Sequence, residues 1–225
     1  MVLFFIQEPA PLQTEKTISL VELIQNGGLG GQLIIGLLFV LLLMVTYIYF
    51  ERLFAIRSAV KVSPNFMPQI RSFVMNGKLE GAQQLCLQEN VPVARLISKG
   101  LSRIGRPLDD INTAIENSGR LEVYQLEKNI SILATISGVA PMLGFLGTVI
   151  GMILSIFEIS NAGGNIDMQL LADGLYTAMT TTVAGLIVGI VGYICYNHLV
   201  VKTNKAVYQM EASSLEFLDL LNEPA

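Results

Sequence analysis

Residue types that often build catalytic, metal or disulfide sites are scarce in this chain of 225 residues, which has two cysteines and one histidine. Cys86 and Cys195 are far apart and in no metal-binding spacing, so we expect neither a disulfide scaffold nor a cysteine-based zinc site. His198 alone cannot form a histidine cluster. Only 14% of the residues are charged, whereas a typical soluble domain has about 25%. An ordinary water-soluble globule is therefore not expected.

Positive charge is also in short supply, because the formal net charge is −4. Nucleic-acid-binding domains are usually basic, so binding to nucleic acid is not expected. The chain has no glycine-rich nucleotide loop after a strand, no Ser/His/Asp arrangement and no cluster of metal ligands. We therefore predict a protein that is not an enzyme and that has no cofactor or metal.

Three long runs lack Asp, Glu, Lys and Arg, and they are 28, 29 and 28 residues long. A helix needs about 20 mainly apolar residues to cross a bilayer. The sequence therefore predicts an all-α integral membrane protein with three transmembrane helices, at 30–50, 131–158 and 174–199. The second and third runs exceed what a bilayer needs, so those helices are expected to protrude.

The basic residues indicate the orientation in the membrane. Eleven of the 14 Lys and Arg lie between Arg52 and Lys128, and two more, Lys202 and Lys205, follow the third run. By the positive-inside rule, the N-terminus is outside and the 51–130 segment and the C-terminal tail are in the cytoplasm.

The remaining segments are predicted to be helical, with breaks at Gly77, Pro92 and Gly105. The 108–128 helix is expected to run on into the second span. The predicted order is a periplasmic segment with an amphipathic helix (1–29), transmembrane helix 1 (30–50), a helical cytoplasmic domain (51–130), transmembrane helix 2 (131–158), a periplasmic loop (159–173), transmembrane helix 3 (174–199) and a cytoplasmic C-terminal helix (200–225).

Small residues recur at spacings of three and four in spans two and three, which collects them on one side of each helix. Such stripes let helix backbones approach closely. We therefore predict that Gly147→Leu or Gly185→Leu would break an oligomer. The first span is apolar on most faces, so it is expected to face lipid, and Leu38→Phe should be tolerated if that face of the helix meets lipid. The predicted packing residues are Gly144, Gly147, Gly151, Gly185 and Gly189.

Hydroxyl side chains in the same two spans are candidates for a polar ion pathway. The common alternative is that each hydroxyl bonds to a carbonyl of its own helix. A carboxylate is the expected proton carrier in a membrane, and these runs contain none at mid-depth, so a partner helix would have to supply it. The candidates are Thr148, Thr177, Thr181, Thr182 and Ser155.

Two segments resemble the ExbB/TolQ/MotA proton-channel family. One is Ala140-Pro-Met-Leu-Gly-Phe-Leu-Gly-Thr-Val-Ile-Gly-Met, and the other is Ala178-Met-Thr-Thr-Thr-Val-Ala-Gly-Leu followed by Tyr196-Asn197. The resemblance covers roughly residues 18–220. ExbB is the most similar branch and TolQ the second, because MotA-type stators have four spans.

This resemblance implies a homopentamer in the bacterial inner membrane. Spans two and three would line a pore around two helices of an ExbD- or TolR-like single-span partner that carries a membrane Asp. Thr148 and Thr182 match pore threonines that face this Asp. Proton flow would be transmitted to a TonB- or TolA-like protein for outer-membrane transport or envelope maintenance.

One position departs from the family pattern. Many ExbB and TolQ chains carry a Glu where this chain has Thr177. Asp173 lies one turn earlier and is either a substitute charge at the outer mouth or simply a helix-start charge. A non-conducting membrane scaffold is the alternative function, and the choice between proton and sodium stays open.

Overall fold

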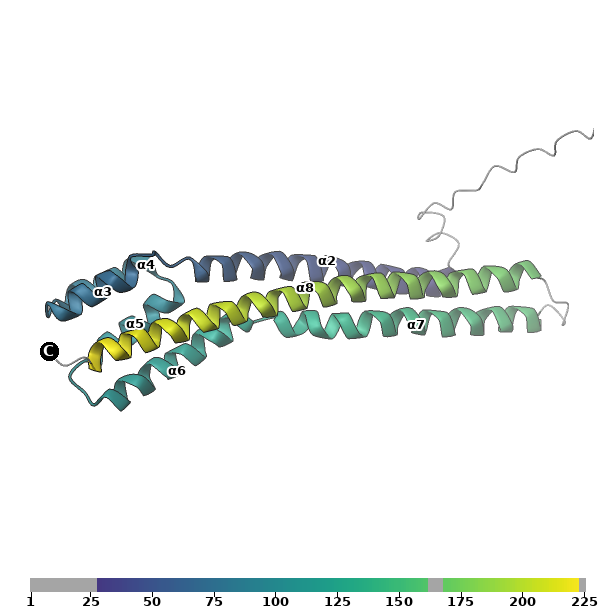
Figure 1. Cartoon of the computed structure of the whole chain (residues 1–225). Helices are drawn as coiled ribbons and strands as arrows, with labels where there is room; N and C mark the ends of the chain where they lie inside the picture. The colour runs from purple at the N-terminus through teal and green to yellow at the C-terminus, as the bar shows by residue number, and fades with distance from the viewer. Residues whose placement is uncertain (1–27, 162–167, 223–225) are drawn as a thin grey trace, which may run out of the picture.

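The computed structural model describes residues 28–161 and 168–222, and within these ranges every regular element is an α-helix (Figure 1). In this described part of the chain, three helices are long and apolar enough to cross a membrane, which confirms the predicted all-α membrane protein. The amphipathic helix predicted within 1–29 lies outside the described residues. The helices are α2 (Gly28–Val60), α3 (Phe66–Met75), α4 (Leu79–Glu89), α5 (Pro92–Leu101), α6 (Leu108–Glu127), α7 (Ile130–Asn161) and α8 (Met168–Asn222).

Helix α8 runs the length of the molecule, and the other elements are arranged along it (Figure 1). Its 55 residues join the third span and the C-terminal tail into one helix, although the two were predicted as separate segments. Helices α2 and α7 lie beside its first part. Helices α3 to α6 gather around its last part, and together with it they form what we call the short-helix bundle.

Helix α2 is covered on one side by α7 and α8 and exposed on the other. Leu38 and Val45 are 1% and 0% exposed, whereas Leu33 and Val40 are 75% and 58% exposed. The expectation that the first span faces lipid is therefore wrong for the face that carries Leu38. Because the apolar residues cover nearly every face of this helix, its pattern does not reveal which face packs.

The predicted continuous helix from 108 into the second span is also wrong. Helix α6 ends at Glu127, and α7 begins at Ile130. Between them, Asn129 has a φ of +65°, in the left-handed region that Asn tolerates better than most residues. The chain therefore turns at this junction, which separates the short-helix bundle from the apolar α7.

Helix α5 lies at the centre of the short-helix bundle. Leu96 and Ile97 are buried, and a Cβ atom added at Gly100 would lie 2.6 Å from the Phe217 ring. Arg95 extends from α5 to α6, where its Nε and Nη2 donate to the two carboxylate oxygens of Glu122 at 2.7 and 2.6 Å. The bundle is thus held by buried apolar side chains and one bidentate ion pair.

Candidate ion pathway between α7 and α8

Helices α7 and α8 touch through their backbones at mid-span. A Cβ atom added at Gly185 would lie 2.6 Å from the Ala140 carbonyl oxygen and 2.8 Å from the Gly144 Cα. One added at Gly189 would lie 2.6 Å from the Pro141 ring. No side chain could fit in these positions without moving a helix. We call this line of contact the glycine seam, and it joins two helices of the same chain.

The other glycines singled out in the sequence also lie along this seam. Gly147 lies directly against the Thr181 side chain. Gly151 faces Ala178, with its added Cβ 3.4 Å from the alanine Cβ. Further along, Gly174 lies against the Ser155 side chain. Small residues of both helices therefore face one another.

The Gly144 carbonyl oxygen is the polar centre of the seam. The Thr182 hydroxyl of α8 donates to it at 3.2 Å, and the Thr181 hydroxyl approaches it at 3.4 Å. In an α-helix this carbonyl also accepts the backbone amide four residues later, which is that of Thr148. The Thr182 hydroxyl and the Thr148 backbone amide therefore share one carbonyl oxygen, whereas the Thr148 hydroxyl donates to the Phe145 carbonyl.

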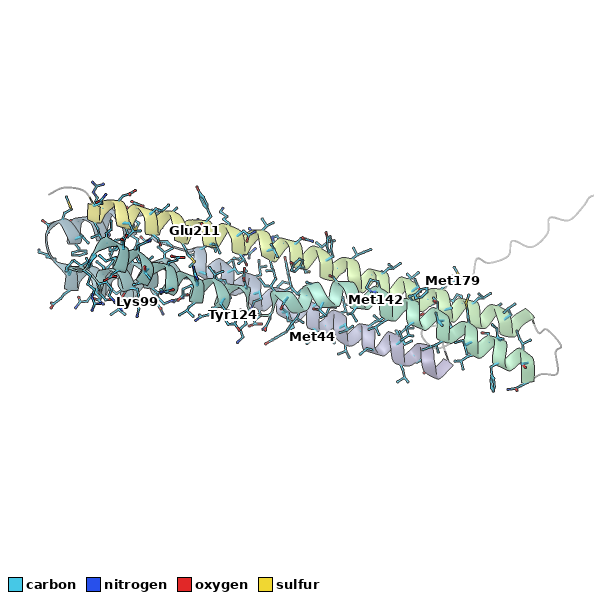
Figure 2. The ribbon with its side chains drawn as sticks, turned by 90° about the horizontal axis from the view of Figure 1, so that it is seen from below. Met44, Lys99, Tyr124, Met142, Met179 and Glu211 are labelled. Carbon is cyan, nitrogen blue, oxygen red and sulfur yellow. The ribbon has the colours of Figure 1, made fainter. Side chains whose placement is uncertain are left out.

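Thr148 and Thr182 border the uncovered side of the helix pair. Both are partly exposed. Their neighbours one turn away are apolar and open: Phe145 beside Thr148 is 66% exposed, and Met179 beside Thr182 is 69% exposed. Met179 is labelled on α8 in Figure 2. The two hydroxyls are therefore placed where another transmembrane helix could reach them.

The remaining candidate hydroxyls lie elsewhere. Thr181 is 0% exposed and donates to the Ala178 carbonyl of its own helix at 2.8 Å. Ser155 is 5% exposed and donates to the Gly151 carbonyl at 2.9 Å. The Thr177 methyl lies 2.8 Å from where a Cβ would stand on Gly31 of α2. The structure thus divides the five candidates into two on the uncovered side and three that pack against a neighbouring membrane-spanning helix.

Bonding to the local helix is common among these hydroxyls. Thr148 donates to the Phe145 carbonyl at 2.6 Å, and Thr180 donates to the Tyr176 carbonyl at 2.9 Å. Thr182 differs, because its hydroxyl bond crosses to the other helix. Asp173 lies in the first turns of α8, and the side chain of this residue is outside the described part.

Some contacts of the site were not apparent from the sequence. Gly31 brings α2 against Thr177, and Pro141 packs on Gly189. At the end of the span, the Tyr49 hydroxyl lies 2.9 Å from His198 Nδ1. Pro141 could have marked its contact with Gly189 in the sequence. A proline inside a helix has no N–H, so the carbonyl four residues earlier lacks its usual hydrogen-bond donor. The pairing of Tyr49 with His198 joins positions 149 residues apart and has no local signal.

Comparison with known proteins places these features in a family. The model of the MotA/TolQ/ExbB proton channel family matches residues 88–212, which include most of the α7–α8 pair. The chain belongs to this family. The predicted resemblance is thereby confirmed.

Individual relatives carry both ExbB and TolQ names. The chain is 31% identical over 156 residues to a biopolymer transport protein ExbB homolog of Methanothermobacter thermautotrophicus, covering 67% of this chain and 54% of that protein. It is 38% identical over 112 residues to biopolymer transport protein ExbB of Aquifex aeolicus, covering 48% of this chain and 74% of that protein. It is also 31% identical over 105 residues to the Tol-Pal system protein TolQ of Haemophilus influenzae, covering 46% of this chain and 45% of that protein. The chain spans about half the length of the first and third of these relatives.

Proposed function

We propose that this protein is the ExbB-like subunit of an ion-driven motor in the bacterial inner membrane. Five copies would surround two helices of an ExbD-like partner and transmit the proton motive force to a TonB-like protein for outer-membrane transport. The observation that carries this proposal is the pair Thr148 and Thr182 on the uncovered side of α7 and α8, where the Thr182 hydroxyl donates across to the Gly144 carbonyl. The ExbB names of two of the relatives support the choice of branch.

The chemistry follows from what a hydroxyl can do beside a carboxyl group. A threonine hydroxyl donates one hydrogen bond and accepts others. With its proton on the Gly144 carbonyl, Thr182 keeps lone pairs that can accept from a protonated Asp or from a water molecule. The charge-free runs of this chain leave the titrating group to the partner. Moving one proton through 100 mV supplies about 2.3 kcal/mol, enough to bias a helix rotation.

The proposed orientation has the N-terminus in the periplasm and both the short-helix bundle and the C-terminus in the cytoplasm. It is supported by the basic residues, since Arg52, Arg57, Lys202 and Lys205 all follow the apolar ends of α2 and α8 on the bundle side. A cysteine placed within 162–165 should then label from the periplasm, and one at Gly105 only from the cytoplasm.

The test removes the two hydroxyls while keeping side-chain shape. Thr148→Val and Thr182→Val, alone and together, should co-purify with the ExbD-like partner but lose proton flux in proteoliposomes. Thr→Ser at the same positions should keep part of the flux. Loss of one such hydrogen bond costs about 1 kcal/mol, so folding should survive.

Two controls separate an ion pathway from general damage. Thr180→Val removes a hydroxyl of the same helix that does not share the face of Thr182, since residues two apart on a helix do not face the same side, so its flux should stay near that of the unchanged protein. Thr135→Val removes a hydroxyl bonded to Ser131 near the other end of α7 and should have a mild effect. Full flux in the Thr148→Val, Thr182→Val double variant would contradict the pathway and favour a non-conducting scaffold.

A TolQ-like role in envelope maintenance is the second candidate, favoured by the match to the Haemophilus influenzae TolQ protein. The partner decides between them. Co-purification with a TonB-like protein supports the first role, and co-purification with a TolA-like protein supports the second.

A further inference from the structure

A basic cavity lies between the end of α2 and the middle of α8, away from the glycine seam. It has a volume of about 410 Å³. Arg57 and Lys61 line it from the α2 side, and Lys202 and Lys205 line it from α8. Lys202 and Lys205 share a face of α8, since residues spaced by three on a helix are neighbours. Arg57 lies in the last turn of α2, and Lys61 directly follows the end of that helix at Val60. We call this space the four-cation cavity.

No acidic residue lines this cavity among the described parts of the chain. The acidic residue nearest to it along α2, Glu51, is paired with Arg52. Within the described ranges, none of the four cations forms an ion pair. Like charges at this spacing repel one another, and an anion held between them would remove that repulsion.

The depth of the cavity indicates where the anion comes from. On α8, Lys202 directly follows the charge-free run. On α2, Arg57 comes seven residues after Phe50, or about 10 Å along a helix. Long basic side chains reach back toward the membrane interface. Arg57 and Lys202 therefore lie within reach of lipid headgroups.

The wall of the cavity is apolar on its membrane side. Leu53 and Ile56 form a buried floor, and the Phe54 ring, which is 63% exposed, stands at the edge. A free phosphate ion would gain nothing from these surfaces. A lipid would place its phosphate among the cations and its glycerol and upper acyl carbons against the apolar wall.

We propose that the four-cation cavity binds the headgroup of one anionic phospholipid, such as phosphatidylglycerol, in the leaflet on the side of the short-helix bundle. Basic pockets between transmembrane helices suit such headgroups. The lipid would hold the end of α2 against α8 by neutralising both cation pairs. This site is separate from the proposed ion pathway, so a negative result for one proposal does not contradict the other.

The test uses the full chain, delipidated in an uncharged detergent, with native mass spectrometry to count bound lipid. Dioleoyl phosphatidylglycerol is compared with dioleoyl phosphatidylcholine, which has the same phosphate but no net charge. We expect one high-affinity phosphatidylglycerol per chain and at least tenfold weaker binding of phosphatidylcholine. Lys202→Gln with Lys205→Gln should weaken phosphatidylglycerol binding about 30-fold, because each cation near the interface contributes about fivefold.

Two further variants separate the cavity from net charge and from folding. Lys99→Gln with Arg106→Gln removes the same charge from exposed positions of the short-helix bundle and should leave binding unchanged; Lys99 is labelled in Figure 2. Lys202→Arg with Lys205→Arg keeps the charge and should keep binding.

Three outcomes would overturn the proposal. The first is equal affinity for the two lipids, and the second is unchanged binding in the Lys202→Gln, Lys205→Gln variant. The third is displacement of the lipid by millimolar glycerol 3-phosphate, which has the phosphate but no acyl chains. That result would assign the cavity to a soluble anion.

Discussion

The glycine seam and the short-helix bundle hold helices together by opposite means. In the seam, backbones touch because side chains are absent: Gly144 meets Gly185, and Gly189 meets Pro141. In the bundle, large side chains fill the space, with Phe66, Phe217 and Ile115 each at most 2% exposed.

The difference reflects the surroundings of each region. Between helices in lipid there is no hydrophobic driving force, so close packing and hydrogen bonds hold them together. In water, burial of apolar side chains supplies the driving force. The seam therefore tolerates exposed apolar residues such as Phe145 on its outside, whereas the bundle relies on its interior.

The largest effect is expected when a side chain is added within the glycine seam. Gly185→Leu would drive a Cβ into the Ala140 carbonyl and the Gly144 backbone. We expect a loss of about 3 kcal/mol or more of folding free energy, since the obstacle is backbone rather than a flexible side chain. Because the seam lies within one chain, the damage should appear in the subunit itself and not only in its assembly. The measurement is the SDS-induced unfolding of purified protein.

Gly36→Leu is the matched control for this change. It also places a leucine in a membrane helix, but an added Cβ there meets nothing within 4 Å. Its unfolding should follow that of the unchanged protein. Equal unfolding of the two variants would contradict the backbone-contact account of the seam.

A smaller effect is expected when the ion pair of the short-helix bundle is broken. Arg95→Met leaves the Glu122 carboxylate, whose side chain is 10% exposed, without its bidentate partner. We expect a loss of about 2 kcal/mol, less than for a fully buried pair because Arg95 itself is 41% exposed. The urea midpoint of the protein in detergent measures it.

The comparison variant is Arg120→Met, which removes an exposed ion pair with Glu116 on the same bundle. Exposed pairs of this kind contribute about 0–1 kcal/mol. If Arg95→Met shifted the urea midpoint no more than Arg120→Met does, the Arg95–Glu122 pair would stabilise the short-helix bundle no more than an exposed pair.

The smallest effect on stability at neutral pH is expected at Cys86 on α4, where the measurable property is the reactivity of the thiol. Burial raises the pKa of this thiol to about 11, so iodoacetamide should react with it very slowly at pH 8 in the folded protein. Leu87→Cys places a thiol on the next residue, where the side chain is 71% exposed, and that thiol should react readily.

The same group gives a pH dependence of stability. Its folded pKa lies above the unfolded value of about 8.5, so its contribution to stability is complete below pH 8.5 and is lost as pH rises toward 11. Cys86→Ser should remove this alkaline loss in thermal unfolding measured from pH 8 to 11. An unchanged alkaline loss in the serine variant would assign it to other groups.

Much of the architecture could be predicted from local pattern. The breaks at Gly77 and Gly105 were predicted because glycine commonly ends a helix, and in the structure both glycines adopt a positive φ, at +68° and +95°. The junction at Asn129 was missed, since a single asparagine in a helical run is a weak stop signal. The covered face of α2 was missed as well, because its apolar residues leave no face distinguishable.

The sequence by itself determined the three membrane spans, because each run without charge is longer than the about 20 apolar residues that a helix needs to cross a bilayer. Only the tertiary structure decided that Thr182 reaches the Gly144 carbonyl while Thr177 lies against Gly31. The two threonines are similar residues of one helix, and their difference depends on how that helix is rotated about its axis. The neighbouring helices set this rotation through contacts between residues far apart in the chain, as they also bring Arg57 and Lys202 to one cavity.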